Sequence, residues 1–126
     1  MRQAAAVCVL AFVLASAVAC GGGGSSSGQP SGSIKVTMTD FKFDPAQISV
    51  PHGKVVFFLV NASSGQLQHD LVIRDGTGNR VAGSELLSAG DTNVFTVDNI
   101  AAGTYTYYCS QPGHEASGMK GTLTVT

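Results

Sequence analysis

The alternation of apolar and polar residues predicts a fold built of β-strands. From Ser33 to Asp40, Ile, Val and Met side chains alternate with Lys and Thr, which is typical of a strand buried on one face. Residues 55–60 are apolar without interruption over a strand length, which indicates a central strand. No segment has a helical repeat. Further short strands are expected at residues 47–50, 69–74, 93–97, 105–109 and 121–126.

Turn residues between these segments complete the prediction. Residues 41–45 are expected to be irregular, because Pro45 prevents regular strand pairing there. Residues 51–54 and 75–79 have the composition of turns. Residues 81–90 fit either one helical turn or a loop that crosses the fold. Seven or eight short strands with frequent turns predict an all-β antiparallel sandwich or barrel.

The first 32 residues differ in composition from the rest. A basic start followed by an apolar run, too short to span a membrane comfortably, predicts that residues 1–19 are an export signal. Cleavage after Ala19 is one interpretation. The other is a bacterial lipobox with lipidation of Cys20, although Ala17 stands where a lipobox usually has Leu. The Gly/Ser-rich tether at 20–32 favours the lipoprotein, and residues 33–126 are left as the folded domain. We therefore expect export to the periplasm or to the outer face of the cell membrane.

The charge pattern limits the partners. The chain has 7 basic and 8 acidic residues, a formal net charge of −1, and its basic residues are scattered. This pattern argues against nucleic acid or an anionic membrane surface as a partner. The membrane is expected to matter only through a lipid at Cys20.

Cys109 is the only cysteine of the predicted domain, because Cys8 lies in the signal and Cys20 in the tether. A lone thiol in an exported protein needs an explanation, since oxidising compartments normally pair thiols. A Cys20–Cys109 disulfide, an inert buried cysteine and a metal ligand all remain open. The residues that follow Cys109 favour its interpretation as a metal ligand, because His114 and Met119 lie in the same loop with four residues between successive donors.

A second imidazole has to come from outside this loop. His69 is the better candidate because it begins a strand, and a sandwich can bring a strand start beside a distant loop. His52 lies in a Pro-His-Gly turn, where an exposed polar residue is expected. Two imidazoles, a thiolate and a weak thioether are the ligands of blue-copper electron-transfer sites. Structural zinc sites rarely use Met, and iron–sulfur clusters need more cysteines. One copper ion is the predicted cofactor.

The motifs around these donors resemble those of the cupredoxins, the family of plastocyanin, azurin and auracyanin. The resemblance covers residues 33–126 and implies a Greek-key antiparallel β-sandwich of seven to eight strands, with copper held by His69, Cys109, His114 and Met119. It rests on the segment 41–50 followed by the turn Pro51-His52-Gly53-Lys54, the strand start His69-Asp70, the run Gly103-Thr104-Tyr105-Thr106-Tyr107-Tyr108-Cys109, and the loop motifs Pro112-Gly113-His114 and Gly118-Met119-Lys120-Gly121.

Two features differ from parts of this family. The spacing Cys-x₄-His-x₄-Met is shared with auracyanin and rusticyanin rather than with plastocyanin or azurin. The residue after the first His is usually Asn, whereas here it is Asp70, and Ser110 follows the Cys. A carboxylate at Asp70 that accepts a hydrogen bond from Ser110 would join the two ligand-bearing segments. A negative charge at Asp70 would also favour Cu(II) and lower the reduction potential.

The resemblance implies an exported, tethered single-electron carrier that cycles between Cu(I) and Cu(II), not an enzyme, and a monomer. His114 is the implied electron port toward a cytochrome, an oxidase or another redox protein, in a surface of small and apolar residues flanked by Glu115 and Lys120. A metallochaperone or copper-storage protein is the alternative, which Cys109 disfavours because such sites tend to lack a thiolate. A copper enzyme with a second centre would need more histidines than the chain has.

Overall fold

The computed structural model describes residues 28–126, which form nine β-strands. The strands are β1 (Ile34–Thr39), β2 (Lys42–Asp44), β3 (Gln47–Val50), β4 (Gly53–Asn61), β5 (Val72–Arg74), β6 (Arg80–Gly83), β7 (Thr92–Ile100), β8 (Gly103–Tyr108) and β9 (Lys120–Val125). Within this range there is no apolar helix of membrane-spanning length. The predicted export signal and most of the tether, Cys20 included, lie outside the described residues.

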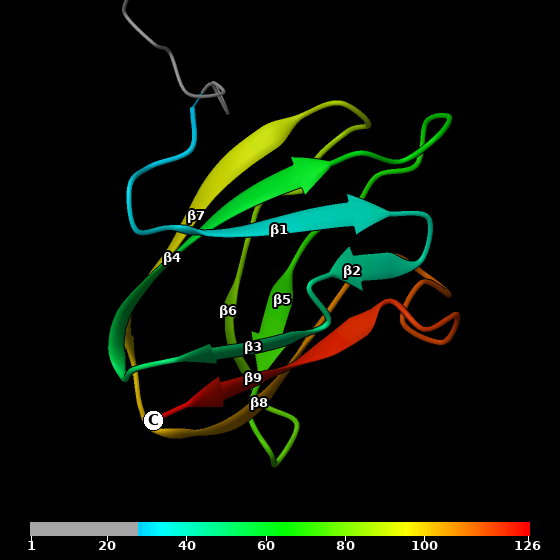
Figure 1. Cartoon of the computed structure of the whole chain (residues 1–126). Coiled ribbons are helices and arrows are strands. Elements are labelled where there is room, and N and C mark those ends of the chain that lie inside the picture. Colours follow the sequence, from blue (N-terminus) through cyan, green and yellow to red (C-terminus); the bar gives the residue numbers. More distant parts are fainter. Residues whose placement is uncertain (1–27) are drawn as a thin grey trace, which may run out of the picture.

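The strands form two sheets that pack against each other (Figure 1). Their orders are β2-β1-β4-β7 and β3-β9-β8-β5-β6. The predicted all-β sandwich is confirmed, with nine strands instead of seven or eight. Two pairs, β1 with β4 and β3 with β9, are parallel rather than antiparallel. The parallel pair β1–β4 arises because the chain crosses to the other sheet as β3 before it returns beside β1.

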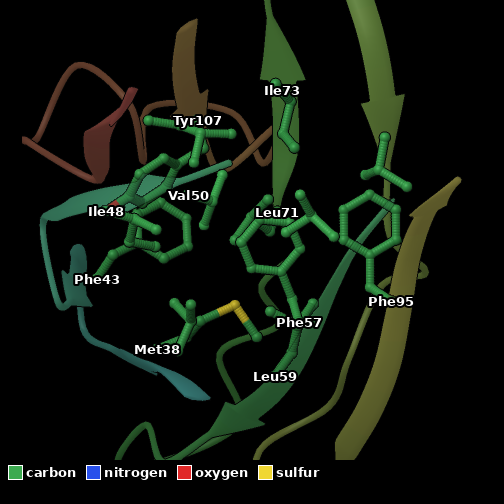
Figure 2. Packing of buried hydrophobic residues seen from close by; sticks show 14 of the residues in the cluster. Met38, Phe43, Ile48, Val50, Phe57, Leu59, Leu71, Ile73, Phe95 and Tyr107 are labelled. Atoms are coloured by element: carbon green, nitrogen blue, oxygen red, sulfur yellow. The ribbon is translucent and has the colours of Figure 1, made fainter. Parts of the chain in front are cut away.

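Inward-facing side chains of both sheets form one apolar core (Figure 2). The predicted alternation is seen in β1, where Val36 and Met38 are buried while their neighbours are more exposed. Figure 2 shows core residues from both sheets: Met38, Phe57, Leu59 and Phe95 from one, and Ile48, Val50, Ile73 and Tyr107 from the other. This packing gives the loops at the ends of the sandwich rigid attachment points.

Three predicted segments differ in detail from the structure. The hairpin strand β2 was not predicted, and it ends at Asp44, immediately before Pro45. The strand expected at 69–74 is regular only from Val72, because His69 pairs in an isolated bridge with Leu87. Residues 81–90 contain most of β6 and then a crossing loop, not a helical turn.

Tyr107 fastens β8 to the segment between β2 and β3. Its hydroxyl donates to the Pro45 carbonyl oxygen at 2.6 Å, and its ring meets Phe43 edge-on with centroids 5.2 Å apart. Burial raises the pKa of Tyr107 to about 12. Directly opposite on β9 is Gly121, and the tyrosine ring occupies the space that a side chain there would need. Gly121 is therefore required by the close approach of Tyr107.

We expect Gly121→Ala to lower the free energy of unfolding by about 1–3 kcal/mol, as overpacking of a filled core does. The added methyl group would overlap the Tyr107 ring and lie 2.6 Å from the Ala46 carbonyl oxygen. Gly76→Ala is the control, because no atom lies within 4 Å of a Cβ there. Urea unfolding of the metal-free proteins, followed by circular dichroism, measures both. Equal unfolding midpoints for the two variants would contradict the overpacking argument.

Candidate metal centre

Three connecting segments meet at one end of the sandwich. The loop between β8 and β9 lies at the same end as the turn between β1 and β2, on the right of Figure 1. The segment that follows β4 carries His69, whose backbone pairs in both directions with Leu87 at 3.0 and 2.8 Å. This bridge places His69 beside the loop, although 40 residues separate it from Cys109.

The side chains of His69, Cys109 and His114 point their donor atoms at one another. The Nδ1 atoms of His69 and His114 are 3.2 Å apart. Cys109 Sγ lies 3.5 Å from Nδ1 of His114 and 3.8 Å from Nδ1 of His69. Among residues 28–126 no other group of three or more His, Cys, Asp or Glu side chains is arranged to hold a metal ion. His69 and Cys109 are fully buried, while His114 is partly exposed.

The spacing of these atoms fits a bound metal. Nitrogen and sulfur ligands of a first-row metal lie at about 2.0 and 2.3 Å, so a trigonal set holds its donor atoms about 3.5–3.8 Å apart. The observed separations of 3.2, 3.5 and 3.8 Å agree with that arrangement. The donor set therefore fits a metal ion without a large rearrangement.

Met119 closes the loop that carries Cys109 and His114. Its backbone N–H donates to the His114 carbonyl at 3.0 Å, and its carbonyl accepts from the Cys109 N–H at 3.2 Å. The Met119 side chain has no exposed surface and belongs to the same buried cluster as Cys109. Met119 is therefore a buried thioether in the same loop as Cys109 and His114.

His52 lies elsewhere. Its ring Nδ1 is 3.0 Å from the carbonyl oxygen of Thr126, at the chain's C-terminus, and the side chain is exposed. The C-terminus is at the opposite end of the sandwich from the β8–β9 loop (Figure 1). The interpretation of His52 as an ordinary turn residue agrees with this placement.

Asp70 and Ser110 join the two segments that carry the donors. The Ser110 backbone N–H donates to Asp70 Oδ1 at 2.7 Å, and the Ser110 hydroxyl donates to Asp70 Oδ2. Asp70 is only 7% exposed. The carboxylate therefore accepts two hydrogen bonds from the residue that follows Cys109, in the arrangement expected from the sequence.

Burial sets the protonation of the metal-free donors. It raises the pKa of the Cys109 thiol, and it lowers the pKa of His69, which the neighbouring His114 lowers further. Both groups are consequently favoured in their neutral forms. Because a cysteine ligates as the thiolate, Cys109 has to release a proton when a metal binds.

Sequence reasoning missed three neighbours of the centre. Phe41 adopts a left-handed backbone (φ 60°), and its ring meets His114 edge-on with centroids 5.0 Å apart. Arg74 pairs with Glu115, the residue that was expected to flank this surface. The Ser63 hydroxyl lies 2.6 Å from Nε2 of His69. No motif marks these residues, because each acts through a contact made only in the folded chain.

Comparison with known proteins identifies the class to which this fold and donor set belong. The model of the family described as copper binding proteins, plastocyanin/azurin family, matches residues 30–126. The chain belongs to this family, the cupredoxins, whose cofactor is one type 1 copper ion, and the donor cluster is consistent with that ion.

Among its relatives are two auracyanins of Chloroflexus aurantiacus. Auracyanin-A is 31% identical, with 99% of this chain and 96% of that protein aligned. Auracyanin-B is 50% identical over 50 residues, which are 40% of this chain and only 21% of that protein. The solved structure of dithionite-reduced auracyanin from Roseiflexus castenholzii superimposes with a TM-score of 0.68 and 26% identity, covering 78% of this chain and 99% of that chain. The expected likeness to cupredoxins is confirmed.

We expect Asp70→Asn to raise the reduction potential of the copper-loaded protein by an amount on the order of 50 mV, which is close to a tenfold change in the relative affinity for the two oxidation states. Asparagine keeps the acceptor for the Ser110 N–H but removes the negative charge that favours Cu(II). Asp98→Asn, an exposed site on β7, is the charge-matched control. A redox titration followed by absorbance measures the potential, and an unchanged or lower value in Asp70→Asn would count against the role of the charge.

Proposed function

We propose that this protein is a single-electron carrier in which His69, Cys109, His114 and Met119 hold one type 1 copper ion. The observation that carries the proposal is the convergence of the two Nδ1 atoms and Sγ at separations of 3.2–3.8 Å. Two imidazoles, a thiolate and a weak thioether are the ligand set of blue-copper electron-transfer sites. Copper supplies the one-electron chemistry, between Cu(I) and Cu(II).

The protein's contribution is to keep the donors in one arrangement. His69 is held by its backbone bridge to Leu87, and Cys109 by its backbone bond to Met119. Because these attachments do not involve the metal, the donors change little between oxidation states, and electron transfer needs little reorganisation. Burial of His69, Cys109 and Met119 keeps water from adding a further ligand.

His114 is the proposed electron port. It is the most exposed of the four residues, and the Phe41 ring, 39% exposed, packs against its edge. Pro112, Gly113 and Ala116 are exposed around it and carry no charge. Such a surface lets a redox partner approach closely in a small, short-lived contact. We propose a cytochrome, an oxidase or another electron-transfer protein as the partner, and a monomeric carrier.

Copper storage or delivery is the alternative function. A protein that hands over copper benefits from an open site whose ligands exchange easily. Here the thiolate donor Cys109 is 1% exposed and Met119 is fully buried. This closed arrangement supports retention of the metal and favours the electron carrier.

We further propose that the protein is exported and attached to the outer face of the cell membrane through a lipid on Cys20. The apolar run that ends at Ala19 and the Gly/Ser-rich segment after Cys20 support this location. A flexible tether would let the copper end of the sandwich reach partners in the same membrane.

Addition of Cu(II) to the purified protein should give an intense blue thiolate-to-copper absorption band and a matching EPR spectrum. Cys109→Ser should abolish the band, because a hydroxyl cannot supply the charge-transfer transition of a thiolate. His52→Ala is the control and should leave the spectrum unchanged. A colourless copper complex of the unmodified protein would overturn the electron-carrier proposal.

Expression of the full chain in a bacterial host should place the protein in the membrane fraction and label it with radioactive palmitate. Cys20→Ser should remove the label and move most of the protein to the soluble exported fraction, since the acylated residue is lost. Cys8→Ala, within the predicted signal, should change neither result. An unlabelled, soluble wild-type protein would show that cleavage occurs without lipidation.

A further inference from the structure

The second ring nitrogen of His69 makes a contact that the copper site itself does not explain. Nδ1 of His69 faces Cys109 and His114, whereas Nε2 lies 2.6 Å from the hydroxyl oxygen of Ser63. A neutral imidazole carries one proton, and a nitrogen that binds a metal needs its lone pair. If Nδ1 is the ligand, Nε2–H is the donor and Ser63 Oγ is the acceptor.

Ser63 is held in place by Asn61, the last residue of β4. The Ser63 backbone N–H donates to Asn61 Oδ1 at 3.1 Å. The Asn61 amide group donates in turn to the carbonyl oxygens of Leu67 and Leu87, at 3.0 and 2.9 Å. Asn61 has no exposed surface. These bonds fix the loop that carries Ser63 without any contribution from a metal.

The same asparagine also fixes the position of His69. Leu87, which accepts from the Asn61 amide, is the residue that pairs with the His69 backbone in both directions. The backbone of Ser63 is therefore bonded directly to the buried Asn61 side chain, and the backbone of His69 is linked to the same side chain through Leu87. A contact built in this way has a defined geometry before metal binding.

A negative charge lies at the outer side of this loop. The Ser64 hydroxyl donates to Asp40 Oδ2 at 2.6 Å, and this bond is the main reason that the pKa of Asp40 is lowered, with a smaller contribution from Ser63. An acceptor for the Nε2 proton makes the imidazole a stronger donor to a metal at Nδ1, and the Ser63 hydroxyl is that acceptor.

We propose that Ser63 is a positioning residue of the copper site, which accepts the Nε2 proton of His69 and so presents the Nδ1 lone pair to the metal in a fixed direction. The inference rests on the proposed function insofar as it takes His69 to be a ligand. It goes further by assigning to a side-chain hydroxyl the choice of tautomer and the orientation of the ring.

The test is the Cu(II) affinity of Ser63→Ala, measured by competition with a chelator. Loss of a hydrogen-bond partner of a metal-bound histidine typically lowers affinity by about 10–100-fold, so we expect a fall of about tenfold or more. Ser63→Thr keeps the hydroxyl and should restore affinity to within about threefold of wild type. Ser64→Ala loses only the bond to Asp40 and is the matched control for the stability of the loop.

A second measurement does not depend on how well the alanine variant folds. In the wild-type Cu(I) protein, which is diamagnetic, NMR should detect a His69 Nε2 proton that exchanges with water at least tenfold more slowly than that of exposed His52. Rapid exchange of this proton would overturn the proposal, as would an affinity of Ser63→Ala within threefold of wild type or an equal fall in Ser64→Ala. A protein that binds no copper at all would instead refute the proposed function, so the two failures are distinguishable.

Discussion

Two hydrogen bonds between Asp70 and Ser110 hold together the two halves of the metal centre. Each residue directly follows a donor, His69 in one segment and Cys109 in the other, and 40 residues separate them in the chain. Packing of the two sheets brings these segments to the same end of the sandwich. Apolar packing has no directional preference, however, and cannot by itself hold the donor atoms 3–4 Å apart. The paired hydrogen bonds supply that direction, and the convergence of the donors depends on it.

Polar burial in the described part of the chain is concentrated at this end. Asn61, His69 and Asp70 are its only buried polar or charged residues, and every buried side-chain nitrogen and oxygen atom there has a hydrogen-bond partner. A buried polar group without a partner costs about 1–3 kcal/mol, so a misplaced loop would be disfavoured. The network therefore penalises other loop conformations and keeps the donors in place when no metal is bound.

Much of the fold and most of the donor set could be predicted from the sequence, because strand alternation and the Cys-x₄-His-x₄-Met spacing are local signals. The parallel pairing of β1 with β4 could not, since it follows from a crossing between sheets that leaves no pattern along the chain. The contacts of Ser63 and Phe41 were also missed. A serine in a polar loop and a phenylalanine near a turn have many ordinary roles, and only their folded neighbours, His69 and His114, distinguish them.

The placement of the donors along the chain has a consequence for the denatured protein. Cys109, His114 and Met119 lie within one short loop, so an unfolded chain still carries three of the four donors close together. A ligand that binds the unfolded state as well as the native state stabilises the fold only by the difference between the two affinities. That difference comes from His69 and from the exclusion of water, so copper is expected to associate with the chain before folding is complete.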